Sequence, residues 1–536
     1  MDVPTPPVFV LDGEAAWKQL FQKVSDDLKK LARPRPDAPP LKGIIERLKE
    51  VKCTSALIQY PYDDEDFLYD YVQQHAWCYR ERGRTCARIH FFAGTPVDPE
   101  NVLADLRRYA IRPGQRVDPA AKPDPYLGFV VVRPTNEECV GRTIIMQPYL
   151  NDPVRQIHVR GRFRTRLYGV ELEADGTPAM QQDRSAHVCA GAALWSLCYY
   201  LHRRYGARRV FPREVTAIAT QTAPHWALAQ GGLSSNQMSR VLRDLGCQID
   251  VRATHLGSKN DPDRRKKLRK LVDVLYGYVI SGVPVVVGYW FGNGWGGHAV
   301  LAVGHDLRSD CVSPPDVRPS GSAKEPVFDS DYCSRFYVVD DQRGPYQELA
   351  IWADGGKIPT AAQAWDADPH VLEHATDLVL VAGLPRATQT FYEKARKIVG
   401  KILLPEMFDQ ALSQDVATIF EETRLRVTLQ QSARFRELLL DAQNGRVGLQ
   451  PRHQAAYRLM PLSRYIYVCE LCRRIPDQNR RLRVRAEILL DSTSPAFEGA
   501  ESVLAVRLEN HLYARGLDPI EESYATYNDP LAPIRV

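Results

Sequence analysis

The stretch QQDRSAHVCAGAALWSLCYYL, residues 181–201, places a cysteine between a polar segment and a run of small and apolar residues. Four small residues, 190–193, follow Cys189, and apolar residues continue from there, so the pattern predicts a core helix with Cys189 in its first turn. A thiol at that position lies at the positive end of the helix dipole, where the thiolate is favoured. Cys189 is therefore a candidate nucleophile. The alternative is a buried structural thiol, the role expected of Cys198 further along the same helix.

A thiolate needs a base, and His298 is the leading candidate. It begins the predicted strand HAVLAVGHD (298–306), directly after the Gly-rich stretch FGNGWGG (291–297), whose glycines allow another chain segment to approach closely. A histidine at the start of a strand lies at the rim of a sheet. Alternation along the strand predicts His305 on the opposite face. His187, two residues before Cys189, is a weaker candidate, and His298 without partners would be an ordinary surface residue.

Two further groups complete the predicted site. The stretch FYVVDDQRGPY (336–346) predicts a strand that ends in Asp340 and Asp341. A carboxylate there can accept a hydrogen bond from the imidazole and orient it. The two side chains are expected to point to opposite faces, so only one can serve, with a preference for Asp340. Gln181 and Gln182 precede Cys189, and a glutamine amide there can join the Cys189 N–H in stabilising an oxyanion.

Composition limits the classes of protein that need be considered. The chain has 536 residues, of which 44% are hydrophobic, enough for two to four domains with their own cores. Its formal net charge of +5 is small for this length, so bulk charge does not argue for a nucleic-acid partner. No apolar run approaches the roughly 18 residues of a membrane span, and the N-terminus lacks the pattern of a secretory signal, so no membrane association is expected.

The cysteines point to a reducing compartment and give no metal centre. Eleven cysteines at irregular spacing argue against a disulfide framework, so we expect a cytoplasmic protein. Cys469 and Cys472 form a CxxC without a second ligand pair, which disfavours zinc. The sequence also contains no HExxH and no GxxxxGK[ST], so we predict neither a metal nor any other cofactor.

The pattern of apolar residues divides the chain into four regions of a mixed α+β protein. These are an N-terminal α/β region (1–125), a β-rich connecting segment (126–180), a central domain (181–385) and a C-terminal region that is first helical and then β (386–536). The predicted helices cover residues 14–32, 100–110, 231–246, 264–282 and much of 388–440. The predicted strands cover residues 126–134, 283–290, 298–306, 335–341, 463–472 and 481–492, with a polar surface insertion at 307–333.

The segments QQDRSAHVCAGAALW, GGLSSNQMSRVLRDLG, GGHAVLAVGHD and FYVVDDQRGPY resemble the papain-like cysteine peptidases. The resemblance covers roughly residues 181–385 and is nearest to the bacterial branch that includes the double-glycine leader peptidases of bacteriocin exporters. It implies a helix packed on an antiparallel sheet, with the site in the cleft between them. The roles that it implies are nucleophile for Cys189, base for His298, orienting carboxylate for Asp340 or Asp341, and oxyanion amide for Gln182 or Gln181. The sequence departs from the family in a longer Gln-to-Cys spacing, in alanine at position 190 and in the length of the 307–333 insertion.

We therefore expect a cytosolic, bacterial thiol peptidase that cleaves a particular protein or peptide, with flanking regions that select the substrate or answer to a regulatory protein partner. A transglutaminase-like acyltransferase or a deconjugating amidase would use the same residues. A binding module with a dispensable site is the third hypothesis, although nucleic acid is disfavoured as a partner. Its support is basic residues at strand or helix spacing: Arg160, Arg162, Arg164 and Arg166, then Arg481, Arg483 and Arg485, and the stretch RRKKLRK at 264–270.

Overall fold

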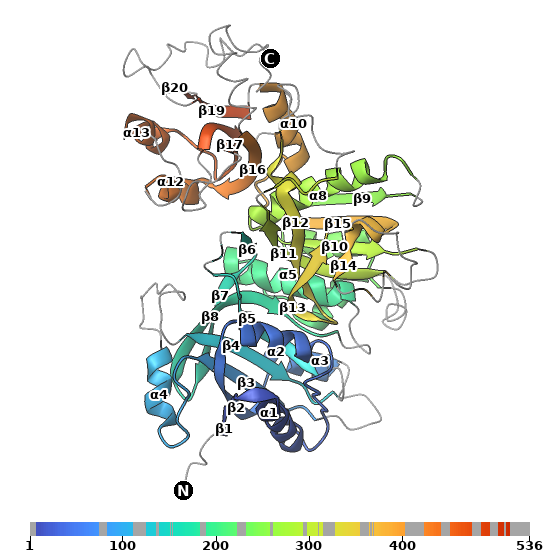
Figure 1. The fold of residues 1–536 in the computed structure, drawn as a ribbon, viewed down its shortest axis with the longest axis vertical. Coiled ribbons are helices and arrows are strands. Elements are labelled where there is room, and N and C mark those ends of the chain that lie inside the picture. Colours follow the sequence, from blue (N-terminus) through green and yellow to red (C-terminus); the bar gives the residue numbers. More distant parts are fainter. Residues whose placement is uncertain are drawn as a thin grey trace.

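The computed structural model shows a mixed α+β protein, as predicted, in which three sheets follow one another along the chain and along the long axis of the molecule (Figure 1). The residues it describes are 7–73, 83–110, 125–135, 139–150, 152, 154–182, 189–221, 232–257, 261–292, 297–308, 310–314, 327–353, 364, 367, 369–402, 423–440, 451–473, 484–493, 502–508 and 511–514. Among the residues described, no helix combines the length and apolar character needed to cross a bilayer.

The first sheet has seven antiparallel strands in the order β1-β2-β3-β4-β5-β8-β7. Their bounds are β1 Val8–Val10, β2 Cys53–Tyr62, β3 Cys86–Ala93, β4 Tyr126–Val132, β5 Val140–Met146, β7 Gly161–Leu167 and β8 Val170–Ala179. Helices α1 (Gly13–Asp27) and α2 (Leu41–Glu50) share a core with one face, and α3 (Glu65–Gln73) and α4 (Val102–Tyr109) share a core with the other. Because both faces are covered, the inner strands β3, β4 and β5 are buried along their whole length.

The second sheet carries the sequence features singled out above. Its strand order is β14-β13-β12-β11-β10-β15-β9, with the short strand β6 also paired to β11. The bounds are β6 Arg155–Ile157, β9 Gln248–His255, β10 Val285–Trp290, β11 His298–Leu307, β12 Cys333–Asp340, β13 Gly344–Ala350, β14 His370–Val371 and β15 Asp377–Leu384. All pairs are antiparallel except β13 with β14. The strands predicted at 283–290, 298–306 and 335–341 are therefore adjacent members of one antiparallel sheet.

Helix α5 (Cys189–Tyr205) lies between the first and second sheets. It contacts β7 and β8 on one side and β10 and β11 on the other, and every residue from Ala190 to Cys198 is buried. The small residues after Cys189 let the helix approach two sheets at once, in keeping with the core helix predicted from the sequence. Helices α6 (Pro212–Ala219) and α7 (Ser235–Asp244) follow, and Ser234 caps α7 by accepting a hydrogen bond from the Gln237 N–H.

Helix α8 (Arg264–Ile280) covers the opposite face of the second sheet and also contacts the third. The third sheet has the order β16-β17-β18-β19-β20, with all pairs antiparallel. The bounds are β16 Thr423–Gln431, β17 Tyr465–Arg473, β18 Val484–Asp491, β19 Val503–Leu508 and β20 His511–Ala514, with helices α10 Tyr392–Ile402, α12 Ser432–Leu440 and α13 Pro451–Leu459.

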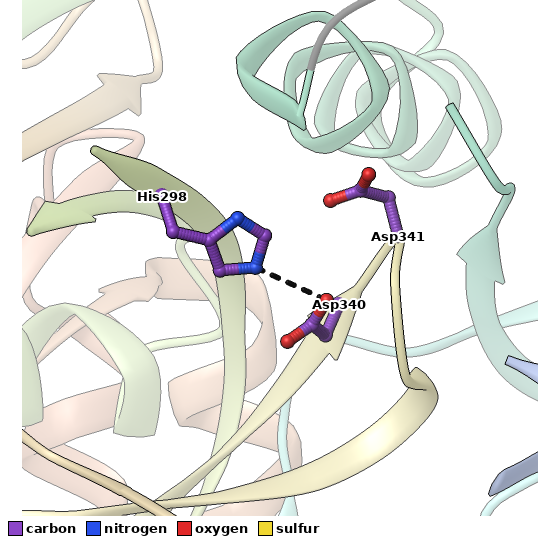
Figure 2. Close-up of side chains that lie close together, drawn as sticks. All are labelled: His298, Asp340 and Asp341. Atoms are coloured by element: carbon purple, nitrogen blue, oxygen red, sulfur yellow. Dashed lines mark hydrogen bonds and ion pairs between the residues drawn. The ribbon is translucent and has the colours of Figure 1, made fainter. Parts of the chain in front are cut away.

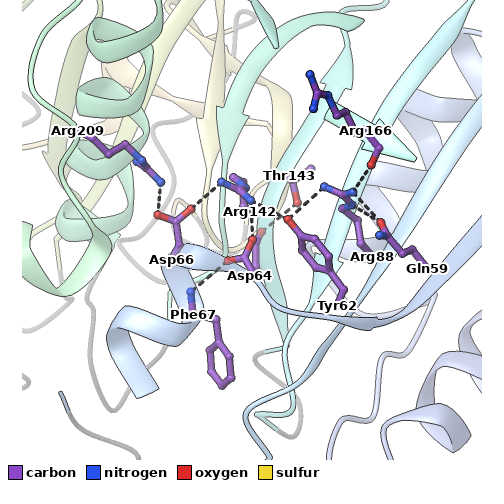
Figure 3. Close-up of polar contacts among 11 residues, drawn as sticks. Gln59, Tyr62, Asp64, Asp66, Phe67, Arg88, Arg142, Thr143, Arg166 and Arg209 are labelled. Atoms are coloured by element: carbon purple, nitrogen blue, oxygen red, sulfur yellow. Dashed lines mark hydrogen bonds and ion pairs between the residues drawn. The ribbon is translucent and has the colours of Figure 1, made fainter. Parts of the chain in front are cut away.

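A buried network of charged groups ties the first sheet to the chain that follows α5 (Figure 3). The Arg142 guanidinium on β5 donates to the Asp64 carboxylate at 2.7 Å and lies 3.3 Å from that of Asp66. Arg209, just beyond α5, pairs with the other Asp66 oxygen. These carboxylates are almost fully buried, so removing the arginine between them would leave charge in a poorly solvated place.

Several local predictions are wrong. The segment 388–440, expected to be helical, contains the buried strand β16 between α10 and α12. The end of the 307–333 insertion is not a surface segment, because residues 327–333 are buried and form the turn η4 (Asp329–Tyr332) against α8. Beyond 481–492, the last strand that the sequence predicted, the chain forms two more strands, β19 and β20.

The two N-terminal helices also differ from the prediction in detail. The helix predicted over residues 14–32 ends earlier, at Asp27, and Leu31 beyond it is 41% exposed. The helix predicted over residues 100–110 begins at Val102, with Asn101 as its N-cap. Asp98 forms the preceding turn, where its carboxylate accepts hydrogen bonds from Glu100 and Asn101.

Candidate active site

His298 and Asp340 lie side by side at one end of the second sheet (Figure 2). His298 is the first residue of β11 and Asp340 is the last residue of the antiparallel neighbour β12, so the two strand ends meet at the same edge. The His298 Nε2 atom lies 3.1 Å from the Asp340 Oδ1 atom. Each residue is only 3% exposed, so this hydrogen bond is shielded from water.

The chain after β12 fixes the Asp340 carboxylate. Its Oδ1 atom also accepts a hydrogen bond from the Gln342 N–H at 2.8 Å, which closes a turn of the kind that aspartate favours. Gly344, which pairs with Asp340 across that turn, has a φ of +100°, a conformation that a side chain would oppose. The Gly-Pro turn noted in the sequence therefore has a structural reason, which is to return the chain tightly at this carboxylate.

Electrostatics favour an imidazolium–carboxylate pair. Burial by itself lowers the pKa of His298, but the Asp340 charge and the hydrogen bond to it outweigh burial, and the pKa lies well above its usual value. Burial by itself raises the pKa of Asp340. The His298 charge and two hydrogen bonds have the larger, opposite effect, so the pKa of Asp340 lies below its usual value. A proton held between these groups belongs mainly to His298.

Cys189 approaches the same imidazole from the helix. It is the first described residue of α5, is half-buried and packs at the edge of the core between the two sheets. The Cys189 thiol interacts with the His298 side chain, and this interaction also raises the pKa of His298. Because Asp340 occupies Nε2, the other ring nitrogen, Nδ1, is the atom left for the thiol.

Asp341 also lies beside His298, contrary to the expectation that the two aspartates point to opposite faces. It is the first residue beyond β12, in a turn, where strand alternation no longer applies. Donor atoms of His298, Asp340 and Asp341 all lie within 4.8 Å of one another. Asp341 is 4% exposed, and among the described residues neither of its carboxylate oxygens has a hydrogen-bond partner. Burial raises its pKa to about 7.

The structure adds two residues that the sequence did not indicate. Tyr289 on β10 pairs directly with His298, and the two rings meet edge to face with centroids 5.7 Å apart. The Tyr289 hydroxyl lies 2.7 Å from Nδ1 of His370, the first residue of β14. Tyr289 could have been found from the β10–β11 hairpin register. His370 enters through a parallel pairing of only two residues, which leaves no periodic pattern in the sequence.

The two candidate oxyanion glutamines differ in position. The Gln181 side-chain oxygen accepts a hydrogen bond from the Val140 N–H at 3.1 Å, so this side chain is anchored to β5 of the first sheet. Gln182 is half-buried and directly precedes residues 183–188, which lie outside the described residues together with the alternative base His187. Because the Gln181 side chain is hydrogen-bonded to β5, Gln182 is the better candidate for the oxyanion amide.

Cys198 and His305 have other environments. Cys198 is fully buried, and burial raises its pKa, as expected for a structural thiol. On β11 a bulge between Ala302 and Gly304 interrupts the alternation on which the position of His305 was predicted. His305 packs on Tyr276 of α8, and its Nε2 atom lies 3.0 Å from Nε2 of His158. Burial lowers the pKa of His305 to about 3, so this histidine pair is neutral.

Most of the basic residues considered for a nucleic-acid surface have acidic or carbonyl partners. Arg160, just before β7, and Arg164 on β7 pair with carboxylates of the adjacent strand β8. In the 264–270 stretch, Arg264 is buried and donates to backbone carbonyl groups, and Arg269 pairs with Asp331. Arg481 and Arg483 lie outside the described residues. The CxxC cysteines of β17 are buried thiols.

Comparison of the chain with models of known protein families gave no match. Comparison with curated protein sequences gave no match at the threshold used.

Proposed function

We propose that this protein is a thiol hydrolase with a papain-like central domain, and specifically a cysteine peptidase, in which Cys189 is the nucleophile, His298 the base and Asp340 the orienting carboxylate. The single observation that supports this most is the position of His298 between Cys189, the first residue of α5, and Asp340, the last residue of β12. Its ring therefore has a thiol as one partner and a carboxylate as the other. Acyl transfer of this kind requires a nucleophile that contacts a base, and a third group that orients the base.

The proposed reaction follows from the two sides of the imidazole. The Cys189 sulfur attacks the carbonyl carbon of a peptide bond, forming a C–S bond while the carbonyl electrons move to oxygen. N–H groups at the first turn of α5 are suited to stabilise that oxyanion, with Gln182 as the candidate side-chain donor. His298 then gives its proton to the leaving amine as the C–N bond breaks. Water hydrolyses the thioester, with His298 taking the water proton, and the free thiol returns.

The surrounding sheets support a selective rather than a digestive enzyme. Helix α5 is enclosed between two sheets, so the first sheet, which has no counterpart in the proposed catalytic domain, adjoins the helix that carries Cys189. A protein or peptide substrate would have to fit beside both. We place the enzyme in the cytoplasm of a bacterium, with a regulatory protein as a further candidate partner; the ten described cysteines are all free thiols, consistent with a reducing compartment.

Transfer of the acyl group to an amine, and removal of a conjugated modifier, remain alternatives because all three reactions share the thioester. The acyl acceptor distinguishes them: in H₂¹⁸O a hydrolase incorporates label into the new carboxyl group, and an acyltransferase incorporates an added amine instead. A basic binding module is less well supported, since the described arginines of β7 and of 264–270 discussed above have partners.

A comparison of two cysteines tests the proposal. A fluorescent iodoacetamide should label the wild type and the Cys198→Ala variant, and it should not label Cys189→Ala at the same low reagent concentration. In cells, new protein N-termini should appear with the wild type and Cys198→Ala and be missing with Cys189→Ala. If labelling persists in Cys189→Ala, or if the three proteins produce the same set of N-termini, Cys189 is not the nucleophile of a peptidase.

A further inference from the structure

The Asp341 carboxylate is the most unusual buried group near the candidate active site. It is enclosed by protein, yet among the described residues neither oxygen accepts a hydrogen bond. Buried carboxylates are normally paired or coordinate a metal, because an unpartnered charge in a poorly solvated place is costly. Figure 2 shows the carboxylate directed into the space between His298 and helix α5, and not away from the site.

The neighbouring groups define what this space can hold. Asp340 and Asp341 bring two carboxylates within 4.8 Å of each other and of a ring nitrogen of His298. Two acidic groups and one imidazole favour a positively charged occupant. The nitrogen donor disfavours Ca²⁺ and Mg²⁺, which select oxygen ligands, whereas imidazole and carboxylate together are common ligands of Zn²⁺.

The spacing also suits zinc. Ligand atoms around a tetrahedral Zn²⁺ ion lie about 3.3–3.5 Å apart, given bonds of about 2.0–2.2 Å. The three donor atoms here would need to close by about 1.5 Å at most, which rotation of the Asp341 side chain can supply because the described residues hold it by no hydrogen bond. Three protein ligands with one open position, which water can fill, is the usual form of an accessible zinc site.

We propose that His298, Asp340 and Asp341 form a Zn²⁺-binding site that inhibits the thiol chemistry. Zinc on the His298 nitrogen takes the place of the proton that His298 and Asp340 share, so the imidazole can neither accept the thiol proton nor donate one to a leaving group. The metal binding stands by itself, whereas its inhibitory consequence rests on the proposed function. No short sequence motif reveals this site, because His298 begins β11, Asp340 ends β12 42 residues later and Asp341 lies in the turn that follows, a spacing that matches neither HExxH nor paired CxxC.

Calorimetric titration of the full-length, untagged protein with zinc chloride tests the metal site directly. We expect one Zn²⁺ per chain with a dissociation constant in the micromolar range or tighter. Asp341→Asn keeps the shape of the side chain and removes its charge, and should weaken binding by at least 10–100-fold, the loss reported for changes that leave the ligands themselves in place. Asp310→Asn, at an exposed aspartate of the polar 310–314 segment, is the matched control and should bind like the wild type.

A measurement on the wild type alone protects the test against a variant that fails to fold. X-ray absorption of the zinc-loaded protein should show nitrogen and oxygen ligands at about 2.0–2.1 Å with the multiple scattering of a single imidazole. A spectrum without imidazole, the absence of a stoichiometric titration, or equal affinity of the wild type and a folded Asp341→Asn variant would each overturn the zinc site.

Activity separates this inference from the proposed function. If zinc binds as described but Cys189→Ala leaves the pattern of new N-termini unchanged, the metal site stands and the peptidase proposal fails. If Cys189→Ala abolishes cleavage but zinc does not bind, the peptidase stands and the metal site fails. When both are correct, zinc should inhibit cleavage over the same concentration range in which it binds.

Discussion

Replacing Asp340 by asparagine removes one negative charge from the candidate active site and retains an oxygen that can accept the hydrogen bonds of His298 and Gln342. The effect should therefore come from charge more than from geometry. Asp340 stabilises the imidazolium form of His298, so the variant should lower the pKa of His298 from its raised position. The form in which a thiolate faces an imidazolium should then be lost at a lower pH than in the wild type.

The size of this change can be worked out from the contact. With the two charges centred about 4 Å apart and an effective dielectric constant of about 20, the attraction is about 4 kcal/mol. At 1.36 kcal/mol for each pH unit, this corresponds to about three units. That value is an upper limit because the Asp341 carboxylate remains within 4.8 Å. We expect the alkaline limb of the activity profile to move by between about one and three pH units toward acid.

The assay is the pH dependence of cleavage and of iodoacetamide incorporation at Cys189, followed at the peptide level by mass spectrometry so that other thiols do not contribute. Asp306→Asn is the matched control, because Asp306 is also buried and lies on β11, the strand that begins with His298, but pairs with Arg308 and Arg335 at the far end of that strand. Its alkaline limb should stay in place. An alkaline limb that is identical in Asp340→Asn and the wild type would refute the role of Asp340.

Three further changes test the packing and electrostatics around the site. Arg142→Met removes the cation between two buried carboxylates (Figure 3) and should lower the free energy of unfolding in urea by about 3–5 kcal/mol. Arg208→Met, at a half-exposed ion pair, is the control and should lower it by less than about 1 kcal/mol. Similar losses in the two variants would contradict the importance of the buried network. Burial lowers the pKa of His305 to about 3, so the contribution of this neutral histidine to stability is full above about pH 6.5 and is lost as the pH falls toward 3. In His305→Leu the slope of unfolding free energy against pH should be smaller by about 1 kcal/mol per pH unit between pH 6 and pH 4. An unchanged slope would be inconsistent with a neutral buried histidine. Gly277→Ala would place a methyl group 1.9 Å from the Tyr392 ring, where helix α8 meets α10. The variant should lose about 1–3 kcal/mol of unfolding free energy and so have a lower thermal midpoint. A variant as stable as the wild type would show that this contact is loose.

The parts of the fold that sequence predicted well are those encoded by local patterns. The apolar strands of the second sheet are buried on both faces and therefore appear as continuous runs, and the α5 helix follows directly from small and apolar residues after Cys189. Strand β16 was missed although its polar residues alternate with apolar ones as in a strand, because it lies between two helices and packs against α8, which ends more than 140 residues earlier in the chain.

The candidate site was predictable where strand ends carry its residues and unpredictable where turns do. His298 and Asp340 end adjacent antiparallel strands, so their meeting at one edge follows once the strands are recognised. The position of Asp341 depends on the turn after β12, and that of His305 on a bulge, and both features break the period of two from which side-chain direction is inferred. The His370 contact with Tyr289 depends on tertiary structure alone.

The packing of α5 connects the two kinds of prediction. A thiol on a helix and an imidazole on a sheet keep a useful separation only if the helix cannot slide along the sheet. Next to Cys189 the small residues of 190–193 are all buried, and their size lets the helix lie close to its neighbours, which include β8 and β11. Their replacement by larger residues would move Cys189 relative to His298 without touching either side chain. Small residues beside the cysteine therefore set how closely the helix that carries the proposed nucleophile can approach the sheet that carries His298.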